Sequence, residues 1–323
     1  MQSFASPAIS VVMHTYDTPI SDLRRAVESI LNQTFRDFEF IIIDDGSTNG
    51  SDEYLKSLQD ERVKIIWNPQ NLGVSKSLNI GLQHACGKYI ARMDADDISL
   101  PTRLEKQFAF LETHPNVVLA GTRHEFFGLQ SRVVTKEIKS QSSYRVEFLF
   151  HFPGPQHPTV LIRRETLVLN NITYDEEALY AEDYVLYIEL CRYGEIATLP
   201  EVLVKKQEHE GQVSYRYNAV QRQTVILICK RLFQELGLSA TEEELELHYK
   251  IGHLCKVEKK DRCRAIKWIL KLLRANMKTK IYNQRELAAF SFKRLVLSCF
   301  PDACDKIYKL KNSIRLPKRT SLF

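Results

Sequence analysis

Three carboxylates within four residues follow an apolar run, and they are the clearest sign of chemistry in this chain. The run occupies residues 89–93, and Asp94, Asp96 and Asp97 come directly after it. Clustered acids repel one another, so grouping them costs free energy unless a cation offsets the charge. Carboxylate oxygens suit Mg²⁺ or Mn²⁺, ions that usually bind together with substrate phosphates. A solvated acidic turn is the competing interpretation of the same segment.

The elements that must position these acids follow from the hydrophobic pattern. Short apolar runs alternate with segments whose apolar residues recur at helical spacing. We expect strands at 9–13, 38–43, 63–67, 89–93 and 117–121, and helices near 23–31, 51–58, 75–85 and 101–113. This alternation predicts an α/β fold with a largely parallel sheet and helices on both faces. Ligands of such sheets bind beyond the carboxyl ends of the strands, where Asp94 and Asp96 lie.

The second half of the chain has a different pattern. It predicts a strand at 132–138, a helix at 143–150, a proline-rich loop at 152–158, a strand at 159–163, a helix at 183–193 and a short strand at 203–206. After Asn218 the pattern is wholly helical. We therefore predict two domains, residues 1–218 and 219–323.

Further polar residues follow the predicted strands or begin helices. They are Thr15, Tyr16 and Asp17 after the first strand, Asp44 and Asp45 after the second, and Lys76 at a helix start. A tyrosine can stack on a nucleobase, a carboxylate can accept the N–H of a uracil or a ribose hydroxyl proton, and a lysine can reach a nucleotide. An ordinary turn, capping of the next helix and a solvated lysine are the alternatives.

Two candidates lie far downstream. Asp183 follows Glu182 in the first turn of a predicted helix, where the helix dipole favours acids and where a carboxylate could serve as a general base. His209 follows the last predicted strand and is either a metal ligand or a surface histidine.

Composition narrows the class of protein. The 323 residues are 44% hydrophobic and 26% charged, as in a folded enzyme. No apolar stretch approaches the ~18 residues of a membrane-spanning helix, and the first residues lack a signal-peptide pattern, so we expect a cytosolic protein. The seven cysteines are scattered and contain no Cys-x-x-Cys pair, so we expect reduced thiols and no zinc site.

The charge is unevenly distributed along the chain. Residues 256–323 contain 19 Lys and Arg against 5 Asp and Glu, a net charge of +14, which leaves −9 for the first 255 residues because the whole chain carries +5. Such a tail indicates an anionic partner, either a membrane surface or a nucleic acid. No nucleic-acid-binding motif is present, so we do not expect the latter.

Part of this tail has the pattern of a basic amphipathic helix. Between residues 259 and 280 the apolar Ile266, Ile269, Leu270, Leu273 and Met277 recur at helical spacing with Trp268 beside them, among many lysines and arginines. Such a helix can lie on an anionic membrane. Alternatively the stripe packs on the acidic first part of the chain or forms an oligomer contact.

The polar segments, in this order and spacing, resemble glycosyltransferase family 2 over about residues 7–215. The matching segments are Thr15-Tyr16-Asp17, Ser29-Ile-Leu-Asn-Gln-Thr-Phe35, Ile43-Asp-Asp-Gly-Ser-Thr48, Asn71-Leu-Gly73, Leu78-Asn-Ile-Gly81, Gly87-Lys-Tyr-Ile-Ala-Arg-Met-Asp-Ala-Asp-Asp97, His157-Pro-Thr159 and Ala181-Glu-Asp183. One departure is His14, where the family often has a proline. The resemblance implies the GT-A fold, a Rossmann-like nucleotide-sugar domain that continues into an acceptor half.

The resemblance also implies roles for individual residues. Asp45, with Asp44 beside it, matches the family's uracil contact, and Tyr16, between Thr15 and Asp17, matches the base-stacking position. Lys76 and Arg92 match positions that often line the nucleotide. Asp94 and Asp96 match the Asp-x-Asp motif, with Asp96 expected to bind the metal directly. Asp183 matches the catalytic base, and His209 matches a histidine that some GT-A enzymes use on the metal or the pyrophosphate.

The chemistry expected from this resemblance is an inverting, metal-dependent transfer of sugar. A UDP-sugar would be the donor, Mn²⁺ or Mg²⁺ the cofactor, and a glycan or lipid-linked glycan the acceptor, in the synthesis of a bacterial surface glycan such as O-antigen, capsule or lipooligosaccharide. The enzyme would lie in the cytoplasm or at the inner face of the cytoplasmic membrane. A non-catalytic sugar-binding protein on the same fold and a nucleotidyltransferase are the alternatives.

Overall fold

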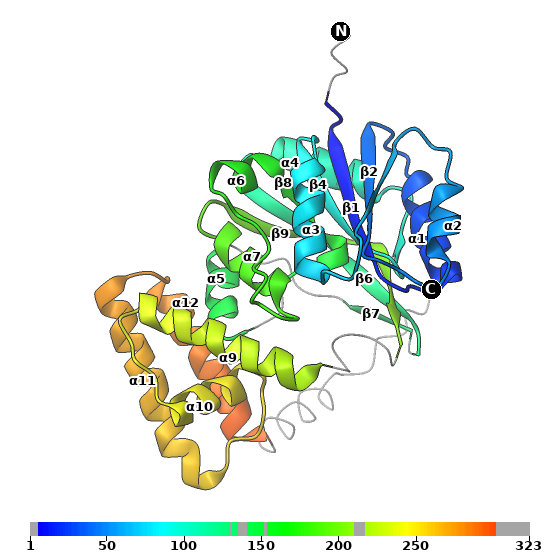
Figure 1. Ribbon diagram of the computed structural model, residues 1–323. Helices are drawn as coiled ribbons and strands as arrows, with labels where there is room; N and C mark the ends of the chain where they lie inside the picture. Colours follow the sequence, from blue (N-terminus) through cyan, green and yellow to red (C-terminus); the bar gives the residue numbers. More distant parts are fainter. Residues whose placement is uncertain (1–5, 130, 135–140, 152–153, 210–216, 302–323) are drawn as a thin grey trace, which may run out of the picture. The chain divides into compact units, whose positions relative to one another are not determined.

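The computed structural model describes residues 6–129, 131–134, 141–151, 154–209 and 217–301. The chain forms two compact units (Figure 1). The first unit comprises Met1–Arg145 and Pro153–Thr224, and the second comprises Val146–Phe152 and Val225–Phe323. The described residues contain no helix long and apolar enough to cross a membrane.

The first unit is built around one nine-stranded sheet. Its strands are β1 (Ile9–Thr15), β2 (Phe38–Asp44), β3 (Val63–Trp67), β4 (Tyr89–Asp94), β5 (Ile98–Ser99), β6 (Val117–Gly128), β7 (Arg132–Val134), β8 (Leu161–Arg163) and β9 (Glu195–Glu208). Their order is β3-β2-β1-β4-β8-β6-β9-β5, with β7 paired to β6. Pairs among β1, β2, β3 and β4, and the pair β6–β9, are parallel; β8, β5 and β7 pair antiparallel to their neighbours.

Helices cover both faces of this sheet, as the α/β prediction required (Figure 1). The helices of the first unit are α1 (Ile20–Leu31), α2 (Ser51–Lys56), α3 (Val74–His84), α4 (Arg103–Thr113), α6 (Arg164–Leu169), α7 (Glu182–Leu190) and the 3₁₀ turn η1 (His157–Thr159). The helix α5 (Gln141–Leu149) begins in the first unit and ends in the second. Alternate residues of β1 point to opposite faces. Val11 belongs to the core with α1, α2 and α4, whereas Val12 contacts α3 at Gly81. No Cβ fits at Gly81, because it would lie 2.5 Å from Val12 Cγ1.

The last long strand differs most from its prediction. We expected four residues at 203–206, but β9 has 14 and pairs with a 12-residue β6 where we expected five. Pro200 made a continuous strand improbable from the sequence alone. The register with β6 shifts between Thr122 and Arg123, opposite Pro200 and Glu201, so a bulge accommodates the residue that lacks an N–H.

Smaller differences concern the middle of the chain. The helix α6 was not expected, and the predicted loop at 152–158 ends in η1. The predicted strand at 132–138 is observed as β7 up to Val134, and its remainder lies outside the described residues.

The second unit is helical and contains most of the basic tail, as expected. It contains most of α9 (Asn218–Glu235), together with α10 (Glu242–Gly252), the turn η2 (Lys259–Asp261), α11 (Arg262–Thr279) and α12 (Gln284–Cys299). Thr241 begins α10 with a capping box completed by Glu244. Trp268 of α11 is 1% exposed and packs edge-on against Phe233 of α9. The predicted division into domains at residues 218/219 stays a prediction. The compact units divide at 224/225, and the second also includes residues 146–152.

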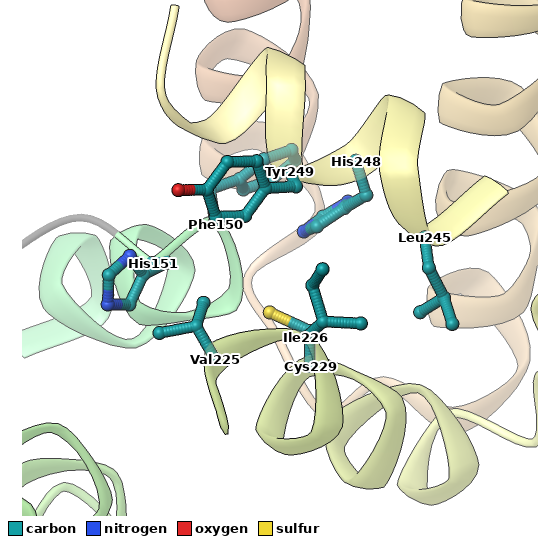
Figure 2. Close-up of a pocket in the computed structure, with 8 residues that line it drawn as sticks. All are labelled: Phe150, His151, Val225, Ile226, Cys229, Leu245, His248 and Tyr249. Atoms are coloured by element: carbon teal, nitrogen blue, oxygen red, sulfur yellow. The ribbon is translucent and has the colours of Figure 1, made fainter. Parts of the chain in front are cut away.

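One small pocket lies inside the second unit (Figure 2). It is lined by Phe150, His151, Val225, Ile226, Cys229, Leu245, His248 and Tyr249. His248 Nε2 lies 2.7 Å from the carbonyl oxygen of Leu149, and Trp268 Nε1–H donates to His248 Nδ1 at 3.1 Å. Both nitrogens of this neutral histidine are therefore engaged in holding the helices together.

Candidate active site

Three strands of the first unit end at the same edge of the sheet. β1 pairs in parallel with both β2 and β4, and the registers place Thr15 opposite Asp44 and His14 opposite Asp94. The acids after β2 and β4 are thus brought to the edge where α/β sheets bind ligands.

Asp94, Asp96 and Asp97 form a carboxylate cluster at the end of β4. One oxygen from each residue lies within 4.8 Å of the others. Asp97 is 1% exposed; its Oδ1 accepts the backbone N–H of Gln207 at 2.8 Å, and its Oδ2 has no hydrogen-bond partner in the described part of the chain. Burial raises the pKa of Asp97 well above its usual value, and burial with the charge of Asp94 raises the pKa of Asp96. A cation would stabilise such a cluster.

Cationic side chains surround the carboxylate cluster. Arg92 Nη2 lies 2.5 Å from Asp94 Oδ1, and Lys206 Nζ lies 3.8 Å from Asp94 Oδ2. Burial alone would raise the pKa of Asp94, but these two charges hold it well below its usual value. His209 Nε2 lies 3.2 Å from Asp96 Oδ2. The structure therefore brings together Arg92, Asp94, Asp96 and His209, all of which the sequence analysis had singled out.

Asp183 and Glu182 begin α7, and their charges interact with this cluster. Asp183 Oδ1 accepts the backbone N–H of Tyr184 at 2.7 Å. Burial raises the pKa of Asp183, and burial together with the Asp183 charge raises the pKa of Glu182 to about 7. Asp94 and Arg92 also influence both pKa values. Two acids with raised pKa values near a carboxylate cluster have the character expected of proton-transfer groups.

Asp45 is fully buried and already bound by the protein. Its oxygens accept hydrogen bonds from Asn68 Nδ2 at 2.7 Å and from the backbone N–H groups of Leu72 and Gly73 at 2.9 Å each. His14 Nε2 lies 3.3 Å from Asp45 Oδ2, which also accepts the N–H of Gly73. Burial opposes ionisation, yet the hydrogen bonds lower the pKa of Asp45 below its usual value. In this structure Asp45 fixes the loop that precedes α3.

Asp44 and Asp17 shape the neighbouring loop. Asp44 Oδ1 accepts the backbone N–H of Ser47 at 2.8 Å, while the buried Oδ2 has no partner among the residues described. The helix α1 begins after Pro19 and has no side-chain cap, so Asp17 does not cap it. Asp17 Oδ1 instead accepts the backbone N–H of Thr48 at 2.7 Å. Thr15 is buried and donates to Thr18 Oγ1 at 3.0 Å.

Two predicted nucleotide contacts are on the surface. Tyr16 is 44% exposed, beside the buried end of β1, and is free to stack on a flat ring. Lys76 is half-exposed in α3 and lies 3.7 Å from Glu176.

Comparisons with known proteins point to one family. Residues 10–168 match the family model described as Glycosyl transferase family 2. An uncharacterised glycosyltransferase of Haemophilus influenzae is 34% identical over 68% of this chain and 71% of its own length. The chain belongs to glycosyl transferase family 2. It is therefore a glycosyltransferase, as the sequence motifs predicted, and the nucleotidyltransferase alternative is wrong.

Other relatives of this family 2 enzyme extend the comparison. The amylovoran biosynthesis glycosyltransferase AmsE of Erwinia amylovora is 27% identical over 71% of this chain and 87% of its own length. Among solved structures, residues 1–349 of TarS from S. aureus superimpose with a TM-score of 0.61, covering 94% of this chain and 92% of that one at 17% identity. The likeness to TarS shows that the GT-A fold prediction is confirmed.

The carboxylate cluster has the donor set that a divalent cation needs. Three hard oxygens converge, and the unpaired Oδ2 of Asp97 is buried beside them. Asp97 was named in the acidic motif but not among the predicted ligands. Asp94 was among the predicted ligands, and both of its oxygens lie close to cations. The ion pair that the described residues make with Asp96 is with the imidazole of His209. The residues present fit Mg²⁺ or Mn²⁺.

Sequence reasoning missed several groups around the carboxylate cluster. Lys206 and Tyr174 were never singled out, although Lys206 faces the cluster and the Tyr174 hydroxyl lies 2.9 Å from His157 Nε2. Arg103 is fully buried and donates to the carbonyl of Arg92 at 2.8 Å, which fixes the end of β4. The sequence did contain one signal for Lys206. This lysine lies inside the strand predicted at 203–206, which ends three residues before His209.

Proposed function

We propose that this glycosyltransferase moves a sugar from a UDP-sugar to an acceptor hydroxyl with inversion at the anomeric carbon. The observation that carries the proposal is the carboxylate cluster with an acid pair, Glu182 and Asp183, coupled to it by charge. A structure of TarS has been determined with UDP-GlcNAc and another with UDP, which supports a UDP-linked donor.

Asp96 and Asp97 would hold the divalent cation, with Asp94 and His209 at its edge. When bound, the cation offsets the charge that develops on the leaving diphosphate. Arg92 stays beside Asp94 and keeps that carboxylate ionised and in place. A cation beside Asp96 and Asp97 would offset the negative charge that Arg92 leaves on the cluster.

Asp183 would take the proton of the attacking hydroxyl. Such a hydroxyl has a pKa far above 7, and a positioned base typically accelerates its attack by about 10²–10⁴-fold. Attack on the face opposite the diphosphate inverts the anomeric centre, so an α-linked donor gives a β-glycoside. Glu182, with a pKa of about 7, is the next candidate for the base.

The nucleoside end of the donor would lie on the β1 and β2 loops. Tyr16 offers an exposed ring for stacking, and Asp44 offers a buried carboxylate oxygen without a partner in the described structure. Asp45, whose oxygens are engaged with the 71–73 loop, would act by shaping that loop. This assigns the uracil contact to Asp44 in preference to Asp45.

A screen of nucleotide sugars tests the donor assignment. Each UDP-sugar is added with Mn²⁺, and both the melting temperature and the release of UDP are measured. A true donor raises the melting temperature, because ligand binding to the folded state stabilises it by about 2.7 kcal/mol at a hundred times Kd. Failure of every UDP-sugar, with a response to another nucleotide sugar, would overturn the UDP assignment.

The acceptor would be a glycan or lipid-linked glycan of a bacterial surface polysaccharide. The name of AmsE, a relative of similar extent, links that protein to amylovoran biosynthesis. A lipid-linked acceptor would favour an enzyme at the inner face of the cytoplasmic membrane. The surface of the basic helical unit is the candidate for binding that membrane.

The structure divides the predicted amphipathic stripe of α11 into two parts. Trp268, Ile269 and Leu273 are buried in the helical unit, whereas Ile266, Leu270 and Met277 are 42%, 38% and 63% exposed. Lys267, Arg274 and Lys278 are exposed on the same helix. We propose that this exposed face of α11 binds an anionic lipid surface, because apolar residues beside basic ones complement both the acyl boundary and the headgroups.

Vesicle co-sedimentation of the full chain tests the membrane proposal. We expect binding to anionic but not to neutral vesicles at low salt. Each basic residue contributes roughly 1 kcal/mol, so K267Q/R274Q should weaken binding by roughly 30-fold. The matched control K56Q/K64Q removes the same charge from the first unit and should leave binding unchanged. Equal loss in both variants, or no binding at all, would contradict the proposal.

A further inference from the structure

The end of β9 supplies one partner for each acid of the carboxylate cluster. Lys206 Nζ faces Asp94, the backbone N–H of Gln207 donates to Asp97, and His209 lies beside Asp96. Of these three partners, only Lys206 carries a permanent charge.

Lys206 is set apart from the other cations by its geometry. Arg92 contacts Asp94 at 2.5 Å, but Lys206 stays 3.8 Å away, beyond hydrogen-bond distance, and its side chain is 22% exposed. Among the described residues no hydrogen bond restrains the ammonium of Lys206, so charge alone holds it at the cluster. All three carboxylates, Asp97, Asp94 and Asp96, act on it at once.

The charges nearly balance without a metal. Even when all three carboxylates are ionised, Arg92 and Lys206 leave a single negative charge, and a divalent cation would exceed it. Lys206 is a flexible, point-like cation, and such a group can leave a carboxylate for a phosphate without breaking a directed hydrogen bond.

We propose that Lys206 is the internal counter-ion of the carboxylate cluster: it occupies the cation's electrostatic place in the donor-free enzyme and turns to the donor diphosphate when metal and donor bind. The inference rests on the proposed metal and UDP-sugar sites. It assigns Lys206 as a positioning residue that competes with the metal when no donor is present and cooperates with it when the donor is bound.

Two affinities separate this role from a merely structural one. Mn²⁺ binding is measured by the loss of the free-ion electron paramagnetic resonance signal without nucleotide, and UDP binding is measured by calorimetry at saturating Mn²⁺. In Lys206→Met the Mn²⁺ Kd should fall, on the order of tenfold, because a competing charge is gone, while the UDP Kd should rise by a similar factor. A structural defect would weaken both.

Matched variants complete the experiment. Lys205→Met removes the adjacent lysine of β9, whose Nζ instead lies 2.8 Å from Glu125, and should change neither affinity. Lys206→Arg keeps the charge and should return the Mn²⁺ Kd toward that of the wild type. Should Lys206→Met not fold, Lys206→Gln carries the same expectation in a polar side chain.

The outcomes distinguish this inference from the proposed function. Failure of both wild-type protein and Lys206→Met to bind Mn²⁺, with and without UDP, would refute the metal assignment and this inference with it. Wild-type protein that binds Mn²⁺ as well as or better than Lys206→Met and Lys206→Gln would refute the inference alone. The inference would be established if Lys206→Met and Lys206→Gln, but not the other variants, bound Mn²⁺ more tightly and UDP more weakly than the wild type.

Discussion

Asp94 and Asp96 are separated by one residue but have different surroundings. Asp94 lies between Arg92 and Lys206, which keep its pKa low, whereas the pKa of Asp96 is raised by burial and by Asp94. A carboxylate with unmet charge gains most from a metal. At the scale of residues, Asp96 is therefore the position where loss of one side chain should affect the metal most.

Asp96→Ala should abolish the metal dependence of UDP binding while the protein stays folded. Calorimetry of UDP with and without Mn²⁺ measures this directly, and Glu125→Ala, at an acid on β6, serves as the control. If the variant and the wild type respond equally to Mn²⁺, Asp96 does not bind the metal.

Asp183→Asn should keep the UDP affinity but lower turnover by about 10²–10⁴-fold, because the amide is nearly isosteric and cannot accept the proton. Steady-state rates and calorimetry on the same preparation provide both values. Glu182→Gln is the matched variant at the neighbouring acid. Near-normal turnover in Asp183→Asn together with loss in Glu182→Gln would move the base to Glu182.

At the scale of elements, α10 and α11 are joined by a buried histidine. Burial lowers the pKa of His248 to about 4, from 6.5, while its hydrogen bonds to Leu149 and Trp268 use both nitrogens. The unfolded chain thus takes up a proton at a higher pH than the folded one. The stability that His248 contributes is complete above pH 6.5 and declines as the pH falls toward 4, by up to about 3 kcal/mol.

We therefore expect the second unit to lose stability between pH 6.5 and 4. Denaturant unfolding followed by Trp268 fluorescence in a Trp67→Phe background would measure the loss, because Trp67 and Trp268 are the two tryptophans of the chain. In His248→Gln, whose amide can make both hydrogen bonds but does not titrate, the pH dependence should flatten. An unchanged slope in that variant would show that another group is responsible.

At the scale of the whole molecule, the helical unit is not one continuous piece of the sequence. It includes residues 146–152, in which Phe150 is fully buried and stacks on His248 at 4.6 Å between ring centroids. Phe290 of α12 packs against the ring of Phe150, with 5.4 Å between the ring centroids. A cut at the predicted boundary of 218/219 would remove both partners and leave this segment behind.

A fragment of residues 1–218 should consequently expose apolar side chains and aggregate, since each fully exposed phenylalanine or leucine costs roughly 1.5–3 kcal/mol. Light scattering and binding of the dye ANS, compared with the full chain, would show it. The same fragment with Phe150→Ser should scatter less. A monomeric 1–218 fragment that binds no ANS would support the predicted domain division instead.

Sequence alone determined the alternating elements of the first unit and the acids that follow β2 and β4. Apolar runs with periods of 2 and 3.6 residues are local signals, and the ends of parallel strands meet at one edge by geometry. That is why the neighbourhood of Asp44 and Asp94 was foreseeable, while the family was inferred from the resemblance of the motifs.

Tertiary structure alone decided what surrounds those acids. The strand β9, which pairs with β6 and β5 in the sheet, lies more than 100 residues downstream and brings Lys206 to Asp94, a pairing that no local pattern encodes. The same holds for Asp45, whose carboxylate could face a ligand or its own protein until the backbone of Leu72 and Gly73 was located. Spacing along a chain fixes which way a side chain points from its own element, but its partners depend on long-range packing.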